Sequence, residues 1–86
     1  MDINIIVKLA KRLFGRINRE INGYRIYTKA EIKEDEENFV NAILSENIDY
    51  IKEKYNNIFI VETLDKKVMS FTYGDIITKT IIIDYL

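Results

Sequence analysis

The stretch KVMSFTYGDIITKTIIIDYL, residues 67–86, decides the fold of this chain. It is dense in β-branched and aromatic residues, which favour strands, and the letters YGD in its middle are typical of a turn. A similar segment, IFIVET at residues 58–63, precedes it and is followed by a second turn signal, LDK. The three segments predict an antiparallel meander. Because side chains alternate between the faces of a strand, Ile81 and Ile83 share one face and Ile82 takes the other, as in a central strand or an edge that a partner covers.

Upstream, residues 3–21 change to a helical period. With about 100° per residue, apolar positions fall on one side of a helix and four cations fall on the opposite side. The apolar positions are Ile3, Ile6, Val7, Leu9, Ala10, Leu13, Phe14, Ile17 and Ile21, and the cations are Lys8, Arg12, Arg16 and Arg19. The pattern predicts one amphipathic helix. Gly15 slightly lowers its stability, and Asn22-Gly23 ends it with a residue in the left-handed conformation. The Asn-Gly pair could instead turn a β-hairpin between RINREI and YRIYT.

The middle of the chain predicts one strand and two helices. GYRIYT at residues 23–28 is rich in aromatic and β-branched residues and indicates a short strand. Thr28 and Glu31 then fit a capping box that opens a second helix. SENIDYIKEKYNN, residues 45–57, indicates a short third helix, separated from the second near Asn47, which is a natural cap.

We therefore expect a single α+β domain over residues 1–86, with the order αβααβββ, because a chain this short has surface for only one core. Over residues 3–73 this order resembles that of a winged helix-turn-helix. The segment ENIDYIKEKYN, in the position of the recognition helix, carries three carboxylates against two lysines and lacks an Arg-rich or Asn/Gln-rich face. We therefore do not expect this helix to recognise DNA bases.

The residues that the chain lacks narrow its chemistry. With no His and no Cys there is no imidazole base, no thiolate nucleophile and no His/Cys zinc site. The spacing of Glu31, Asp35 and Asn38 could hold a hard cation, but no loop motif supports it, so we expect no metal and no cofactor. We expect a non-enzymatic protein in the cytoplasm, because there is no cysteine to cross-link, no signal-like start and no apolar run of about 20 residues.

Charge is strongly segregated although the net charge is only −1. Residues 1–30 carry seven cations and two anions, whereas residues 31–53 carry two cations and eight anions. If both amphipathic helices bury their apolar sides in one core, their charged sides must point outward and neutralise each other only at the margins. The sequence therefore predicts a molecule with a basic patch and an acidic patch.

Each patch suggests a partner. The acidic patch could occupy the basic groove of a nucleic-acid-handling complex, which would make the chain a protein-binding inhibitor of the anti-CRISPR or anti-restriction kind. Its residues are Glu31, Glu34, Asp35, Glu36 and Glu37. The alternative is a nucleic-acid-binding module that contacts phosphates through Lys8, Arg12, Arg16 and Arg19. A membrane contact by the same helix is not expected, since it would remove a large apolar face from the core.

A third possibility is a homo-oligomeric structural subunit. The Ile-rich last strand could pair with its own copy by edge addition. Tyrosines at predicted strand ends could also anchor an interface, because their rings are amphipathic. These tyrosines are Tyr24, Tyr27, Tyr73 and Tyr85.

Overall fold

The computed structural model describes residues 2–29 and 34–86, with the side chains of residues 34–36 outside that description. The chain forms its elements in the predicted order αβααβββ, so the α+β fold class is confirmed. The helices are α1 (Ile3–Phe14), α2 (Glu34–Leu44) and α3 (Ile48–Lys54). The strands are β1 (Ile21–Thr28), β2 (Asn57–Glu62), β3 (Lys66–Tyr73) and β4 (Ile76–Tyr85).

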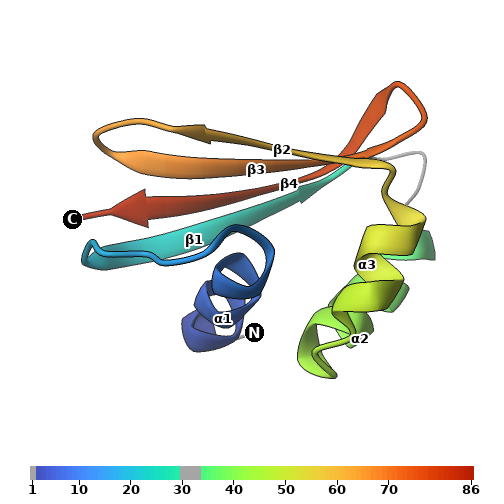
Figure 1. Ribbon diagram of the computed structural model, residues 1–86, viewed down its shortest axis with the longest axis horizontal. Helices are drawn as coiled ribbons and strands as arrows, with labels where there is room; N and C mark the ends of the chain where they lie inside the picture. Colours follow the sequence, from blue (N-terminus) through green and yellow to red (C-terminus); the bar gives the residue numbers. More distant parts are fainter. Residues whose placement is uncertain (1, 30–33) are drawn as a thin grey trace.

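The strands form one antiparallel sheet in the order β1-β4-β3-β2 (Figure 1). The last three strands are the predicted meander, and β1 joins them on the far side of β4. Of the two positions that the sequence left open for the last strand, β4 takes the central one, and β1 and β2 are the edge strands. Ile81 and Ile83 are fully buried, whereas Ile82 between them is only partly covered.

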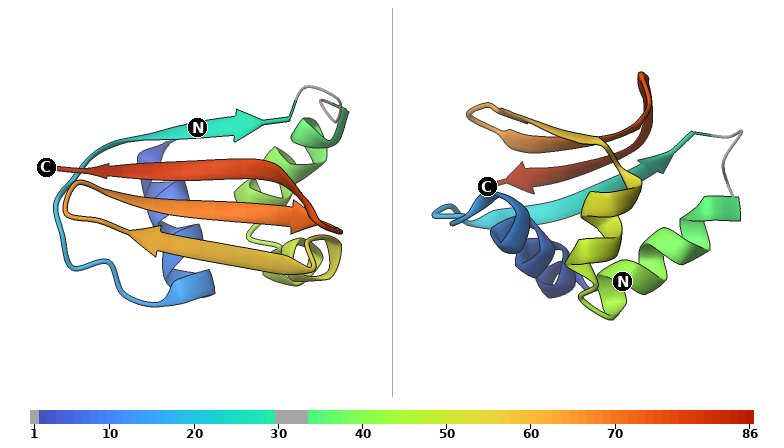
Figure 2. Two further views of the ribbon diagram at one scale, coloured as in Figure 1. Left: turned by 90° about the horizontal axis from the view of Figure 1, so that it is seen from above. Right: turned by 45° about the vertical axis from the view of Figure 1, so that its right-hand side comes forward.

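All three helices lie on the same side of the sheet, and the left view of Figure 2 shows them behind the four strands. The core is the layer between the helices and the sheet. Phe39 of α2, Tyr55 after α3 and Phe71 of β3 meet edge to face, with ring centroids 5.3–5.7 Å apart. Lys79 of β4 is enclosed beside them, and its ammonium lies 5.2 Å from the centroid of the Phe39 ring.

The first helix is shorter than the sequence predicts. It ends at Phe14 because Gly15 takes a φ of 89°, which a residue with a Cβ rarely adopts. The Gly15 N–H donates to the Lys11 carbonyl. Ile17 and Ile21 still pack against the core, so their helical spacing reflects burial and not a continuing helix. Neither expectation for Asn22-Gly23 is correct, because the pair lies inside β1 at a register shift between Ile21 and Gly23.

The connection between α2 and α3 is a tight turn. Asn47 donates its N–H to the Ala42 carbonyl and Glu46 donates to that of Ile43, a Schellman motif in which Glu46 has a φ of 57°. The predicted cap of α3 is confirmed, because the Asn47 side chain accepts from the Tyr50 N–H at 3.2 Å. The predicted capping box cannot be placed, since Thr28 ends β1 and Glu31 is outside the described residues.

Within residues 2–29 and 34–86, no helix has the length and apolarity that crossing a membrane requires.

Candidate functional site

The sheet has one face that no helix covers in the part of the chain that the structure describes (Figure 2). Strand register places its side chains in rows that run across the four strands. One row holds Tyr27, Thr80, Ser70 and Phe59, and the next holds Arg25, Ile82, Val68 and Val61. We call these eight residues the open face. They come from four strands, so only the assembled sheet creates this surface.

The open face carries exposed aromatic or aliphatic side chains at both of its edges. Tyr27 on β1 is 52% exposed, and Phe59 and Val61 on β2 are 55% and 60% exposed. Among the described residues, every exposed large hydrophobic side chain except Leu44 belongs to a strand, to a strand turn or to the last residue of the chain. Most of the exposed apolar side chains thus come from the sheet and its turns, and Tyr27, Phe59 and Val61 among them lie on the open face.

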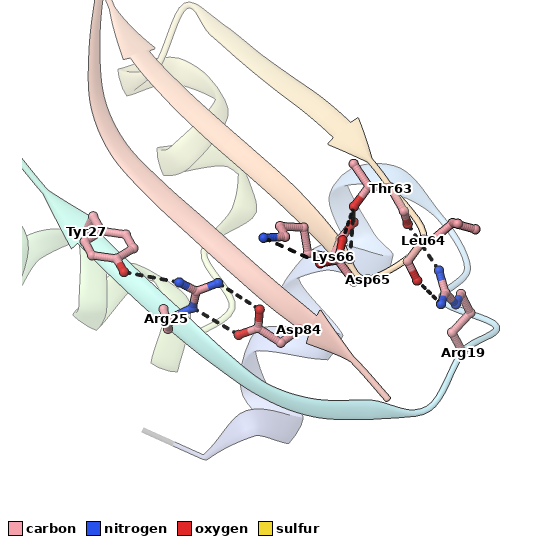
Figure 3. A network of polar contacts seen from close by, with 8 residues as sticks. All are labelled: Arg19, Arg25, Tyr27, Thr63, Leu64, Asp65, Lys66 and Asp84. Carbon is pink, nitrogen blue, oxygen red and sulfur yellow. Dashed lines mark hydrogen bonds and ion pairs between the residues drawn. The ribbon is translucent and has the colours of Figure 1, made fainter.

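The charges beside the open face are compensated (Figure 3). Arg25 donates hydrogen bonds of 3.0 and 2.8 Å to the two carboxylate oxygens of Asp84, which raises the pKa of Arg25. It also donates to the Tyr27 hydroxyl at 3.5 Å. At the β2–β3 turn, the Lys66 ammonium lies 3.8 Å from the Asp65 carboxylate. These charges therefore occur as pairs of opposite sign.

The cations of α1 are partly neutralised by the acidic third of the chain. Lys8 forms an ion pair with the Glu46 carboxylate, and the Arg12 guanidinium lies 3.6 Å from the same carboxylate. Arg12 also donates to the Glu46 main-chain carbonyl at 3.5 Å. The hydrogen bond and charge of Lys8, with the charge of Arg12, lower the pKa of Glu46. Sequence reasoning did not find this contact, because it depends on the left-handed turn after α2.

The four predicted nucleic-acid-binding cations do not share one helical face. Lys8 and Arg12 lie on α1, whereas Arg16 and Arg19 follow its end. Arg19 donates to the carbonyls of Thr63, at 3.2 Å, and Leu64, as Figure 3 shows. Its guanidinium also lies 4.2 Å from the centroid of the Tyr85 ring. Arg19 therefore ties the loop before β1 to the β2–β3 turn, and phosphate binding by this set stays a prediction.

The predicted acidic patch falls mostly outside what the structure describes. Glu31 is outside the described residues, and only the backbone of Glu34, Asp35 and Glu36 is placed, in the first turn of α2. Glu37 is exposed. Negative charge at this end of a helix is favourable in itself, so the location has a structural explanation as well. Partner binding through these carboxylates stays a prediction.

A pocket of about 220 Å³ lies among the three helices. Its floor is apolar, and Lys8, Arg12 and Glu46 stand at its rim. Both cations already contact Glu46, so the rim holds three charges that partly compensate one another. Within residues 2–29 and 34–86, no group of three or more Asp or Glu residues is arranged to hold a metal ion.

Two of the four predicted anchor tyrosines are exposed. Tyr27 lies on the open face and Tyr73 at the β3–β4 turn, whereas Tyr24 and Tyr85 pack against the core. The contributions of Phe59 and Val61 were missed, although the continuous apolar run IFIV signals a strand that is apolar on both faces. Comparisons with protein-family models, curated proteins and solved structures found no match to this chain.

Proposed function

We propose that this chain is a small protein-binding regulator that contacts its partner through the open face. The observation that supports the proposal is that three exposed apolar side chains, Tyr27, Phe59 and Val61, lie on the uncovered side of a sheet whose opposite side holds the core. Tyr27 and Phe59 stand at opposite edges of the face, where rigid amphipathic rings can serve as anchors. Between them Thr80 and Ser70 form a lower, polar floor that can supply hydrogen bonds.

A binding role fits the chemistry of the chain better than catalysis. Its residue types exclude imidazole and thiol chemistry. The open face holds Arg25 in a pair with Asp84, and α1 holds Lys8 in a pair with Glu46, so neither surface presents a free run of cations for phosphates. The absence of cysteine suits a cytoplasmic setting, which is part of the same proposal.

The narrower activity is inhibition of a nucleic-acid-handling complex. Residues 31–53 carry eight carboxylates against two lysines, so this segment would be attracted to a basic groove. Long-range attraction of this kind mostly raises the rate of encounter, whereas buried apolar contact sets the lifetime of a complex. In this proposal the acidic segment steers the approach and the open face makes the durable contact.

Capture from the native cell followed by reconstitution with the purified partner tests the open face. Phe59→Ser and Tyr27→Ser remove the two anchors, and we expect at least tenfold weaker binding, mostly through faster dissociation. Leu44→Ser removes an equally exposed apolar side chain from the helical side and is the matched control. Equal losses in all three variants, or no loss in the two face variants, would contradict the proposal.

Charge reversal tests the steering role separately. The triple change Glu34→Lys, Glu36→Lys and Glu37→Lys should slow association with a basic partner and leave the dissociation rate almost unchanged. The effect should shrink as salt rises, because exposed charges are screened. Unchanged association at low salt would remove the acidic segment from the mechanism and leave the open face as the contact.

A further inference from the structure

The two edge strands of the sheet differ in how they are protected. β1 carries Arg25 within the strand and Lys29 directly after it, and its ladder to β4 contains a register shift. Charges and bulges of this kind discourage a further strand from adding. β2 has no charged residue over 57–61, contains no proline, and pairs with β3 without any register shift. β2 therefore presents a regular edge that is uncharged over residues 57–61.

The register identifies the main-chain groups on this edge. The Thr63 N–H donates to the Lys66 carbonyl at 2.9 Å, so these residues form a hydrogen-bonded pair of the β2–β3 ladder. Because such pairs alternate along an antiparallel ladder, Ile58, Ile60 and Glu62 point their N–H and C=O groups away from β3. No hydrogen bond among residues 2–29 and 34–86 engages these outward groups. Such an edge is a template for another strand.

We propose that β2 pairs antiparallel with β2 of a second copy of this chain, about a two-fold axis beside Ile60. In this register Ile60 faces Ile60 of the second copy, Ile58 faces Glu62, and Phe59 faces Val61. Each outward residue then exchanges both of its hydrogen bonds, which gives six bonds between the copies. The two four-stranded sheets become one eight-stranded sheet, and the two open faces become one continuous surface.

The absence of a like-charge contact and the cross-strand pairs that form favour a second copy as the occupant. The only charged residue of β2, Glu62, meets an isoleucine and not its own counterpart. On the open face, Phe59 and Val61 form aromatic–β-branched cross-strand pairs, a stabilising combination, and both lose part of their exposure. The assembly closes as a dimer, because each copy has one such edge and the remaining edges are the charged, bulged β1 strands. This inference does not depend on the proposed regulatory function.

The homodimer predicted from the sequence used the last strand. That route is occupied in the folded chain, because β4 pairs with β1 on one side and with β3 on the other. Edge addition therefore has to use β2 or β1. We choose β2 because its edge is the unprotected one. The last strand, β4, which the sequence favoured for self-association, is paired on both sides within the monomer.

A proline substitution tests the pairing without disturbing the ladder within the monomer. Ile60→Pro removes the outward N–H, whereas Ile60→Ala loses most of the side chain and keeps the N–H. Sedimentation equilibrium should show a dimer for the wild type and for Ile60→Ala, and at least tenfold weaker dimerisation for Ile60→Pro, with far-UV circular dichroism as the check on folding. A wild-type chain that stays monomeric at millimolar concentration, or equal dimerisation of the two variants, would overturn the proposal.

Disulfide trapping tests the register and does not require the proline variant to fold. The chain has no cysteine, so Phe59→Cys and Val61→Cys each introduce a single thiol. In the proposed register these positions face each other as a non-hydrogen-bonded pair, close enough for a disulfide. A mixture of the two variants under mild oxidation should therefore yield mainly the mixed disulfide. A statistical mixture of products would refute this register and with it the proposed pairing.

Discussion

Arg25 of β1 and Asp84 of β4 are joined by two parallel hydrogen bonds across the sheet surface, although they lie at diagonal and not directly opposite positions of the ladder. The contact neutralises the charges beside the open face and holds the guanidinium next to the Tyr27 hydroxyl. It thus pairs the charges of Arg25 and Asp84 with each other at this surface.

Asp84→Ala tests how much this pair contributes to stability. Both side chains are partly exposed to solvent, so we expect only a small fall in the urea midpoint of unfolding. The difference from the wild type should shrink in about 1 M salt, where screening acts over roughly 3 Å. A loss as large as that of a core substitution, and independent of salt, would show that the pair is a structural anchor of β1.

Ile82 and Ile83 are neighbours on β4 and test the one-sided arrangement of helices. Ile83 is fully buried under the helices, so Ile83→Ala should lower the free energy of unfolding by about 2–5 kcal/mol. Ile82 lies on the open face, and Ile82→Ala should cost about 1 kcal/mol or less. Urea unfolding at one protein concentration measures both. Similar losses would mean that the open face is covered in solution.

The fold was largely predictable from the sequence because its decisive signals are local and agree with one another. The apolar run Ile81 to Ile83 favours a central strand, and β4 does pair with β1 on one side and with β3 on the other. Asn47 has a polar side chain at the start of a short apolar period, and it caps α3 as expected. Such patterns need no knowledge of distant partners.

The end of α1 and the candidate site were not predictable in the same way. The helical period of Ile17 and Ile21 persists because both side chains reach the core, although Gly15 has already ended the helix. The open face exists only when β1 and β2, which are distant in sequence, become the two edges of one sheet. Charge counting also included Glu46 among the carboxylates of the acidic segment 31–53, whereas the turn after α2 directs it to Lys8. Each of these outcomes depends on tertiary packing, which the local pattern does not contain.

Glu46 holds a left-handed backbone conformation at a position where glycine is usual. We expect Glu46→Gly to be more stable than Glu46→Ala, because both remove the ion pair with Lys8 and only glycine avoids the steric penalty of a Cβ at this φ. Thermal unfolding of the two variants side by side measures the difference. An alanine variant that equals or exceeds the glycine variant would show that the Schellman turn is not formed in solution.

Tyr85 makes stability depend on pH in the alkaline range. Burial, with a 2.5 Å hydrogen bond from its hydroxyl to Glu62, raises the pKa of Tyr85 from its ordinary value of 10.0 to about 12. A raised pKa means that the folded state favours the neutral phenol. The resulting stabilisation is complete below about pH 10 and is lost as the pH rises towards about 12. Burial raises the pKa of Tyr55 as well, so a second tyrosine acts in the same direction.

Tyr85→Phe should therefore flatten the decline in the free energy of unfolding between about pH 10 and about pH 12, leaving the part that is due to Tyr55. Urea unfolding at a series of pH values measures this slope. Tyr73→Phe is the control, because Tyr73 is exposed at the β3–β4 turn and its removal should leave the slope unchanged. If the slope of Tyr85→Phe matches that of the wild type, Tyr85 is not enclosed against Glu62, and the contact between the end of β4 and β2 is absent.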